Sequence, residues 1–277
     1  MIAVPIPMVR SLFVLGVATA LGCGGATPRA GSTPEGTLTL LGHGRLVAMA
    51  ELELDARSTF HVPTRGCQDV LVLGVEGTAA VAPEGDQEAL IEPGLGIRLG
   101  HGSSADRTIR ARNDHAKVFL VFARPESRPF PDQTTSLELL SPPDCRELGD
   151  GTFTLADGSR AGPFLHRGGA LRVSIYFDAG HGAEWAGLGL LDADPSVDVP
   201  EHVHEGSAEV LYFLDGEGTM RLGEREIAIR PGAFAYVPAG VRHGFRPTGA
   251  RPLRAYQTYA PSGPEQRFRL TDPAPAN

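Results

Sequence analysis

Lysine is almost absent from this sequence of 277 residues. Among its 25 basic side chains only Lys117 is a lysine, so chemistry through a lysine Schiff base has a single candidate. The basic residues are outnumbered by 33 acidic ones, which gives a formal net charge of −8. A chain with this balance lacks the positive footprint that nucleic-acid binding requires, and no nucleic-acid partner is expected.

Long hydrophobic runs are also missing, apart from one near the N-terminus. Residues 12–21 (LFVLGVATAL) have the length of a signal-peptide core and are too short to span a bilayer. The sequence at 20–23, Ala-Leu-Gly-Cys, resembles the cleavage box of bacterial lipoproteins, with its leucine one place late. We therefore expect a signal peptide over 1–22, lipidation of Cys23 and a flexible tether over 23–37. An ordinary secretory signal is the alternative.

Cysteines are few, and their number agrees with export to the periplasmic side of a bacterial membrane. If Cys23 carries lipid, Cys67 and Cys145 remain as an even pair that can form a disulfide in an oxidising compartment. Two unpaired buried thiols are the alternative. No other segment reaches the roughly 18 apolar residues of a membrane span, so membrane contact is expected only through the lipid anchor.

Glycine and proline, by contrast, are abundant. They number 35 and 23, about a fifth of the chain against a usual share of roughly 12%. Short strands with alternating apolar and polar residues fill 38–124 and again 164–262, and neither region has a long helical stripe. A connector over 125–163 lies between them, and a polar tail covers 263–277. The prediction is an all-β protein with two tandem domains.

The two strand-rich regions repeat short sequence patterns in the same order. Leu54-Asp55-Ala56 recurs as Leu191-Asp192-Ala193, and Glu76-Gly77-Thr78 recurs as Glu217-Gly218-Thr219. Single matches of this kind are weak, but their shared order is rarely produced by chance. Two tandem β-domains are therefore favoured over one continuous sandwich.

Side chains suited to metal binding gather in the second region. His202 and His204 stand two residues apart and project from one face of a strand, while Glu209 begins the next strand. His243 follows a turn-rich loop farther on. Three imidazoles and one carboxylate suit one divalent Fe, Mn, Ni, Cu or Zn ion and leave positions open for water or substrate.

This spacing resembles the two signature motifs of the cupin superfamily. The matching positions are His202, His204, Glu209 and Gly216 for the first motif, and Gly232, Pro238, Gly240 and His243 for the second. The departures, Ser196 and Pro247, are not ligands. The resemblance implies a double-stranded β-helix, or jelly-roll barrel, with a metal inside its mouth, and a bicupin whose N-terminal half is degenerate.

The first region lacks this quartet in either register. Its corresponding positions hold Arg65, Cys67 and Asp69, or, when aligned through Gly77, His61, Pro63 and Gln68. A metal-free structural barrel is therefore expected. An irregular site is the alternative, made of His61, Cys67, Asp69 and His101.

Candidates for shaping a substrate lie on the strands around the metal motif. They are Tyr212, Tyr236, Arg242, Phe245, Tyr256 and Gln257. Alternation does not say which of Tyr256 and Gln257 points inward, and most of the six are expected to be barrel core or rim because strands favour aromatic residues.

These features predict an exported metal-dependent enzyme, of dioxygenase type, that acts on a small molecule. Isomerase, lyase or hydrolase chemistry with the metal as a Lewis acid is the alternative, as is a binding module for a small ligand or the metal itself, because one fold hosts all three. A monomer or a homodimer is expected.

Overall fold

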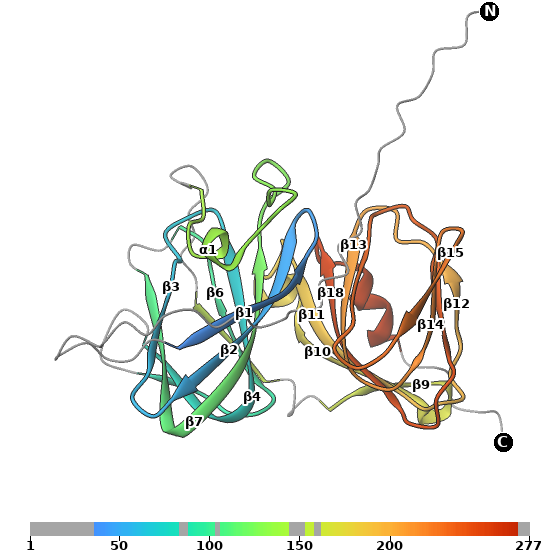
Figure 1. The fold of residues 1–277 in the computed structure, drawn as a ribbon, viewed down its shortest axis with the longest axis horizontal. Helices are drawn as coiled ribbons and strands as arrows, with labels where there is room; N and C mark the ends of the chain where they lie inside the picture. The colour runs from blue at the N-terminus through green and yellow to red at the C-terminus, as the bar shows by residue number, and fades with distance from the viewer. Residues whose placement is uncertain (1–35, 83–87, 103–105, 144–152, 158–161, 271–277) are drawn as a thin grey trace, which may run out of the picture.

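Two β-barrels lie side by side in the computed structural model (Figure 1). The structure describes residues 36–82, 88–102, 106–143, 153–157 and 162–270. The predicted all-β fold is confirmed, since strands dominate both barrels. Within these residues no helix is long and apolar enough to cross a membrane. The expected signal peptide, Cys23 and Cys145 lie outside the described residues.

The N-terminal barrel is built from one sheet of eight strands. Their order is β1-β2-β7-β4-β6-β8, with β3 paired to β7 and β5 paired to β4. The strands are β1 (Thr37–His43), β2 (Val47–Asp55), β3 (Thr59–Val62), β4 (Asp69–Ala82), β5 (Ala89–Ile91), β6 (Leu95–Leu99), β7 (Arg107–Ala123) and β8 (Phe153–Asp157). The last strand comes from the predicted connector, which also holds the short helix α1 (Ser136–Leu139).

The C-terminal barrel has two sheets, ordered β16-β13-β18-β11-β10-β9 and β12-β17-β14-β15. Its strands are β9 (Phe164–His166), β10 (Leu171–Phe177), β11 (Gly187–Ala193), β12 (Val199–His202), β13 (Ala208–Asp215), β14 (Gly218–Leu222), β15 (Arg225–Ile229), β16 (Phe234–Val237), β17 (His243–Pro247) and β18 (Leu253–Ala260). Its 3₁₀ turns are η1 (Arg167–Gly169), η2 (Ala179–His181) and η3 (Pro264–Arg269).

The repeat predicted from the sequence has the same topology in both halves. The order β1-β2-β7-β4-β6 of the first barrel corresponds to β10-β11-β18-β13-β16 of the second. Strands β4 and β7 are long and continuous, whereas their counterparts are divided into β13 with β14 and β17 with β18. The division after β13 is at Gly216, which has φ +84. A Cβ there would lie 2.7 Å from the backbone of Leu253, so glycine is required.

Strict alternation along the strands separates barrel interiors from the surface between the barrels. On β13, Leu211 and Phe213 enter the core of the C-terminal barrel, while Val210 packs against the first barrel. On β4, Val70 and Val72 enter the first barrel's core. A period of two residues therefore gives β4 and β13 two buried faces along these segments.

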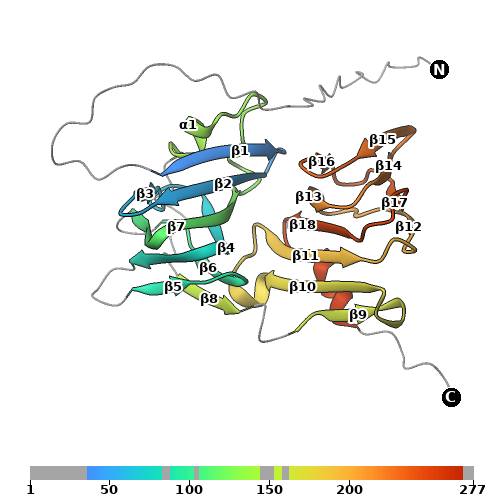
Figure 2. The ribbon, with the colours of Figure 1, turned by 60° about the horizontal axis from the view of Figure 1, so that its bottom comes forward.

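The barrels share a continuous apolar interface. It includes Leu71, Leu73 and Phe119 from the first barrel and Val210 and Tyr256 from the second. The rings of Phe119 and Tyr256 stack with centroids 4.1 Å apart. Figure 2 shows β1 directed toward β16, and β6 approaches β10 in the same interface. In the repeat β1 corresponds to β10 and β16 corresponds to β6. The two contacts are therefore related by an approximate two-fold axis.

An ion pair is buried beside this interface. Asp69 accepts two hydrogen bonds from the Arg98 guanidinium, at 3.1 and 2.9 Å, and both side chains are 2% exposed. The other carboxylate oxygen accepts the backbone N–H of His101 at 2.9 Å and contacts its Nδ1 at 2.7 Å. The His101 ring stacks on Trp185 of the second barrel, with centroids 3.9 Å apart. The charge cluster therefore connects the two halves.

The predicted connector fills the N-terminal barrel. Phe130 and Leu139 belong to its hydrophobic core. Arg124 donates to Gln68 at 3.0 Å, and Gln68 donates to the carbonyl of Leu139 at 2.7 Å. Arg124 also lies over the Phe130 ring, 4.1 Å from its centroid, and burial lowers the pKa of this arginine to about 10. The connector therefore contributes to the core of this barrel.

The structure bears on the predicted disulfide through one of its two cysteines. Cys67 is disulfide-bonded, and its N–H donates to the carbonyl of Pro143, two residues before Cys145, at 2.8 Å. Pairing with Cys145 stays a prediction. We expect peptide mapping without reductant to recover the two cysteines in one linked fragment, because the bond joins the barrel to its connector and constrains the unfolded chain. Two thiols that alkylate freely in exported protein would contradict it.

Candidate metal centre

The first two histidines of the motif lie where β12 ends and the following loop begins. His202 pairs across the sheet with His243 on β17. The Nδ1 atom of His202 donates to the carbonyl of Pro200 at 2.9 Å, which leaves the lone pair on Nε2. That Nε2 atom is buried, and among the described residues it has no hydrogen-bond partner. A buried imidazole lone pair without a donor is the arrangement that a metal ion would satisfy.

The other two donors face the same point. His243 donates from Nδ1 to the carbonyl of Val241 at 2.9 Å, and its Nε2 lies 2.6 Å from Oε2 of Glu209. The Nε2 atom of His204 is 3.3 Å from the same oxygen. The loop before His243 is fixed by Gly240 at φ +76, whose N–H donates to the carbonyl of His204 at 2.8 Å. Backbone carbonyls thus orient two of the three imidazoles.

The donor atoms of His202, His204, Glu209 and His243 all lie within 4.8 Å of one another. Three of these residues are buried and His202 is partly buried. The set combines imidazole nitrogens with one carboxylate oxygen, which is the chemistry that divalent first-row transition metals prefer. The residues present therefore fit a divalent transition-metal ion, as the sequence predicts.

The charge states of Glu209 and His202 suit this role. Burial alone would raise the pKa of Glu209, but hydrogen bonds from His204 and His243 hold that pKa well below its usual range. Burial lowers the pKa of His202. Glu209 is consequently a carboxylate at neutral pH, and His202 is neutral and able to donate its lone pair.

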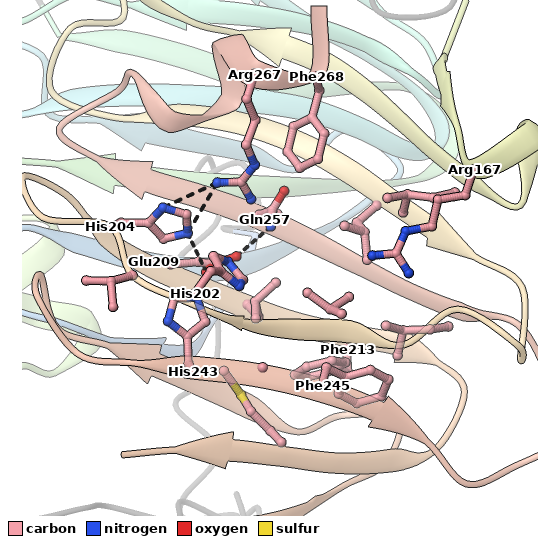
Figure 3. Close-up of a pocket in the computed structure, with 18 residues that line it drawn as sticks. Arg167, His202, His204, Glu209, Phe213, His243, Phe245, Gln257, Arg267 and Phe268 are labelled. Carbon is pink, nitrogen blue, oxygen red and sulfur yellow. Dashed lines mark hydrogen bonds and ion pairs between the residues drawn. The ribbon is translucent and has the colours of Figure 1, made fainter. Parts of the chain in front are cut away.

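Two further side chains hold the oxygen of Glu209 that faces away from the histidines. Gln257 donates its amide N–H to Oε1, and the hydroxyl of Tyr259 donates to the same atom at 3.3 Å. The guanidinium of Arg267 donates to that hydroxyl at 2.8 Å and lies 3.3 Å from Nδ1 of His204. Figure 3 shows Gln257 bonded to Glu209, and Arg267 beside the His204 ring. Outer contacts of this kind orient metal ligands.

Arg267 is held in place by the turn that carries it. The neighbouring side chains of η3 bind buried Asp178, with the Gln266 amide at 2.8 Å and the Arg269 guanidinium also in contact. Burial alone would raise the pKa of Asp178, but its bonds to Gln266, Arg269 and His181 bring it down to about 2. Asp178 therefore stays charged across the neutral range, and its contacts with Gln266 and Arg269 fix η3 over the barrel.

A cavity of about 410 Å³ opens beside the four candidate ligands. It lies inside the C-terminal barrel and is lined by all four of them, by Gln257 and Arg267, and by many apolar side chains. Its size falls within the range of small-molecule pockets. A metal held by these residues would face the cavity.

The structure sorts the six candidates for shaping a substrate. Phe245 and Gln257 line the cavity. Tyr212, Tyr236 and Tyr256 pack instead in the interface between the barrels, and Arg242 is exposed. Strand alternation accounts for this, because Gln257 points inward on β18 and Tyr256 must then point outward.

Sequence reasoning missed three residues of the site. Tyr259 lies two residues after Gln257 on the same strand face, so alternation would have indicated it once Gln257 was placed. Arg267 and Phe268 line the cavity from a segment interpreted as a polar tail. Only folding of η3 onto the barrel reveals them.

The first barrel holds different residues at the corresponding positions. Alternation aligns Val70 with Leu211, so Gln68 stands where Glu209 stands and Arg124 where Tyr259 stands. This favours the register in which His61 corresponds to His202, and His61 is exposed. Asp69 and His101 contact each other outside the barrel core, in the interface cluster. The four residues of the irregular alternative are therefore not assembled as one site.

Comparison with known proteins agrees with this geometry. Residues 189–259 match the cupin domain family. The C-terminal barrel is a cupin domain. This chain is 40% identical over 48 residues to quercetin 2,3-dioxygenase of Bacillus subtilis, covering 17% of this chain and 14% of that protein. It is 41% identical over 58 residues to acireductone dioxygenase of Rhodopseudomonas palustris, covering 20% and 34%. The alignments thus span about a third or less of these relatives.

The whole two-barrel arrangement resembles a solved bicupin. A variant of Bacillus subtilis oxalate decarboxylase superposes with a TM-score of 0.63 at 14% identity, covering 83% of this chain and 74% of that one. At this identity the likeness concerns the fold. It confirms the predicted architecture of two tandem jelly-roll barrels in one chain.

Proposed function

We propose that this chain is a metal-dependent dioxygenase acting on a small organic molecule. The observation that supports this most directly is the group of four metal-capable residues, three of them buried and one partly buried, beside a cavity inside the cupin barrel. The curated relatives that match part of this chain are dioxygenases, which favours oxygen chemistry over the alternatives. A bound Fe, Mn, Ni or Cu ion would supply Lewis-acid and redox chemistry there.

The chain's own residues would bind and orient the substrate. Glu209 keeps one oxygen toward the histidines because Gln257 and Tyr259 hold the other. Burial raises the pKa of Tyr259 well above its usual value, and Glu209 adds to this, so its hydroxyl keeps its proton at neutral pH. Arg267 supplies a positive charge beside His204 that would attract an anionic group. The apolar cavity wall would exclude water from the bound molecule.

The proposal is tested by metal content and oxygen uptake. Protein purified without added metal should contain a redox-active ion by elemental analysis. Samples are reloaded separately with Fe²⁺, Mn²⁺, Ni²⁺, Cu²⁺ or Zn²⁺ and given a substrate that can bind the metal through its own oxygen atoms. At least one of the first four samples should consume dioxygen, and the Zn²⁺ sample should not. Conversion of substrate without oxygen uptake would instead indicate an isomerase, lyase or hydrolase. Ligand binding without any conversion would indicate a binding module.

We further propose that the protein is exported and anchored through lipid on Cys23. The apolar run ending at this cysteine and the Gly- and Pro-containing tether after it support the proposal. A diacylglycerol with an added acyl chain gives stable attachment, whereas one chain is marginal. Wild-type protein should fractionate with membranes, and Cys23→Ser should remain unprocessed or become soluble with its metal content unchanged. Soluble wild-type protein whose N-terminus is not Cys23 would contradict the anchor.

A further inference from the structure

The cavity is polar at its two ends and apolar between them. One end holds the four candidate metal ligands and Arg267, and the other end holds Arg167 (Figure 3). Phe213 and Phe268 lie between these ends in Figure 3, and Leu171, Leu191, Leu211 and Leu253 are among the other apolar side chains that line the cavity. Such a division requires a ligand whose own polar groups are separated by an apolar body, because each polar group buried against an apolar wall would lose its hydration without compensation.

The charges in the cavity favour an anion. Two guanidinium groups, Arg167 and Arg267, face a single carboxylate, Glu209, and a divalent ion would add further positive charge. Arg267 is fixed at the metal end by its bond to Tyr259 and by the hydrogen bond between the neighbouring Gln266 and Asp178. A positive charge held beside an enclosed cavity stabilises a negatively charged ligand more than one in open water does.

Arg167 provides a second recognition point at the far end. It lies on η1, is exposed, and donates to the backbone carbonyl of Asp198. Its guanidinium points toward the apolar side chains of the cavity in Figure 3. This residue has φ +52, a left-handed conformation uncommon for a residue other than glycine, and two glycines follow it. The local backbone thus places a charged side chain at the mouth of an apolar chamber.

We infer that the substrate is an elongated organic acid with an oxygen-donor head at the metal, a ring-sized apolar body, and a carboxylate at Arg167. This inference rests on the proposed function for the metal end. A short dicarboxylate would contact only that end and leave the apolar wall unused. Removing apolar surface from water is favourable in proportion to its area, so filling the chamber is a large part of the available affinity.

Three probes separate the parts of this inference. Oxalate has donor oxygens and no body, propylcatechol has an oxygen-donor head with an apolar body, and dihydroxyphenylpropanoate adds a terminal carboxylate to a body of nearly the same size. Binding to Zn²⁺-loaded protein is measured by calorimetry, so that no turnover interferes. We expect dihydroxyphenylpropanoate to bind roughly tenfold more tightly than propylcatechol, as one charge-assisted hydrogen bond predicts, and oxalate to bind most weakly.

Matched variants assign each contribution to a residue. Arg167→Met should remove the tenfold preference for the terminal carboxylate and leave propylcatechol binding unchanged, while Arg167→Lys should retain part of it. Phe213→Ala should weaken both catechols and not oxalate. The inference is overturned if oxalate binds as tightly as the aromatic ligands, or if Arg167→Met leaves the preference intact.

The outcomes for this inference and for the dioxygenase proposal are distinguishable. Oxygen uptake with short dicarboxylates alone would support the dioxygenase and reject the elongated acid. The predicted binding order without oxygen uptake for any redox metal would do the opposite. Calorimetry on the Zn²⁺ form and oxygen uptake on the other forms therefore test different statements about one cavity.

Discussion

Replacing His202 with alanine is expected to abolish stoichiometric metal binding. Its Nε2 is buried, directed to the site by the bond from Nδ1 to Pro200, and has no other partner among the described residues. Loss of an outer partner of a metal ligand typically weakens binding 10- to 100-fold, so loss of the ligand itself should weaken it by more than about 100-fold. Elemental analysis after gel filtration measures the loss directly. His204→Ala and His243→Ala should behave alike.

The first barrel offers a matched control for this experiment. His61 is the counterpart of His202 in the register supported by strand alternation, yet it is exposed on β3. We expect His61→Ala and His101→Ala to keep one metal per chain. Two equivalents of metal in the wild-type protein, or a loss of metal in His61→Ala, would show that the first barrel also binds an ion.

The metal ligands were predictable because their spacing in the sequence determines which side chains point to the same side. Two residues at i and i+2 of an extended segment point to the same side, and a glycine at each turn sets where the next strand returns. The prediction that both histidines lie on one strand is wrong for His204, because β12 ends at His202 and His204 lies in the loop that follows. His202, His204, Glu209 and His243 could therefore be placed together without any knowledge of packing. The two tandem barrels followed from the ordered repeat in the same way.

The surroundings of the ligands depend on packing that alternation does not determine. Tyr212 and Tyr256 are residue types that often line substrate pockets, but the N-terminal barrel covers their face of the sheet and packs Phe119 against them. Arg267 reaches the site only because Asp178, far away in sequence, holds the turn that carries it. Contacts between segments that are distant in sequence determine such positions, and local sequence periodicity does not predict those contacts.

The largest effect on stability is expected from Asp69→Ala. The carboxylate is buried and accepts hydrogen bonds from Arg98 and from the backbone of His101. Removing one partner of a buried ion pair usually destabilises a protein by about 3–5 kcal/mol, since the remaining charge stays in a low-dielectric environment. The midpoint of thermal unfolding should fall by roughly 10 °C. Metal content in the cold should be unchanged, because the ligands lie in the other barrel.

Glu126→Ala serves as the surface control for this substitution. Glu126 also pairs with an arginine, Arg45, at 3.6 Å, but their side chains are 79% and 60% exposed, and such pairs contribute about 0–1 kcal/mol. Asp69→Asn, which keeps the size and an acceptor oxygen, should be intermediate. The double variant Asp69→Leu with Arg98→Met removes both charges and should recover much of the loss, because a buried pair is often replaceable by apolar side chains of similar volume. If Asp69→Ala unfolds at the same temperature as Glu126→Ala, the ion pair does not stabilise the contact between the barrels, and the apolar interface alone holds them together.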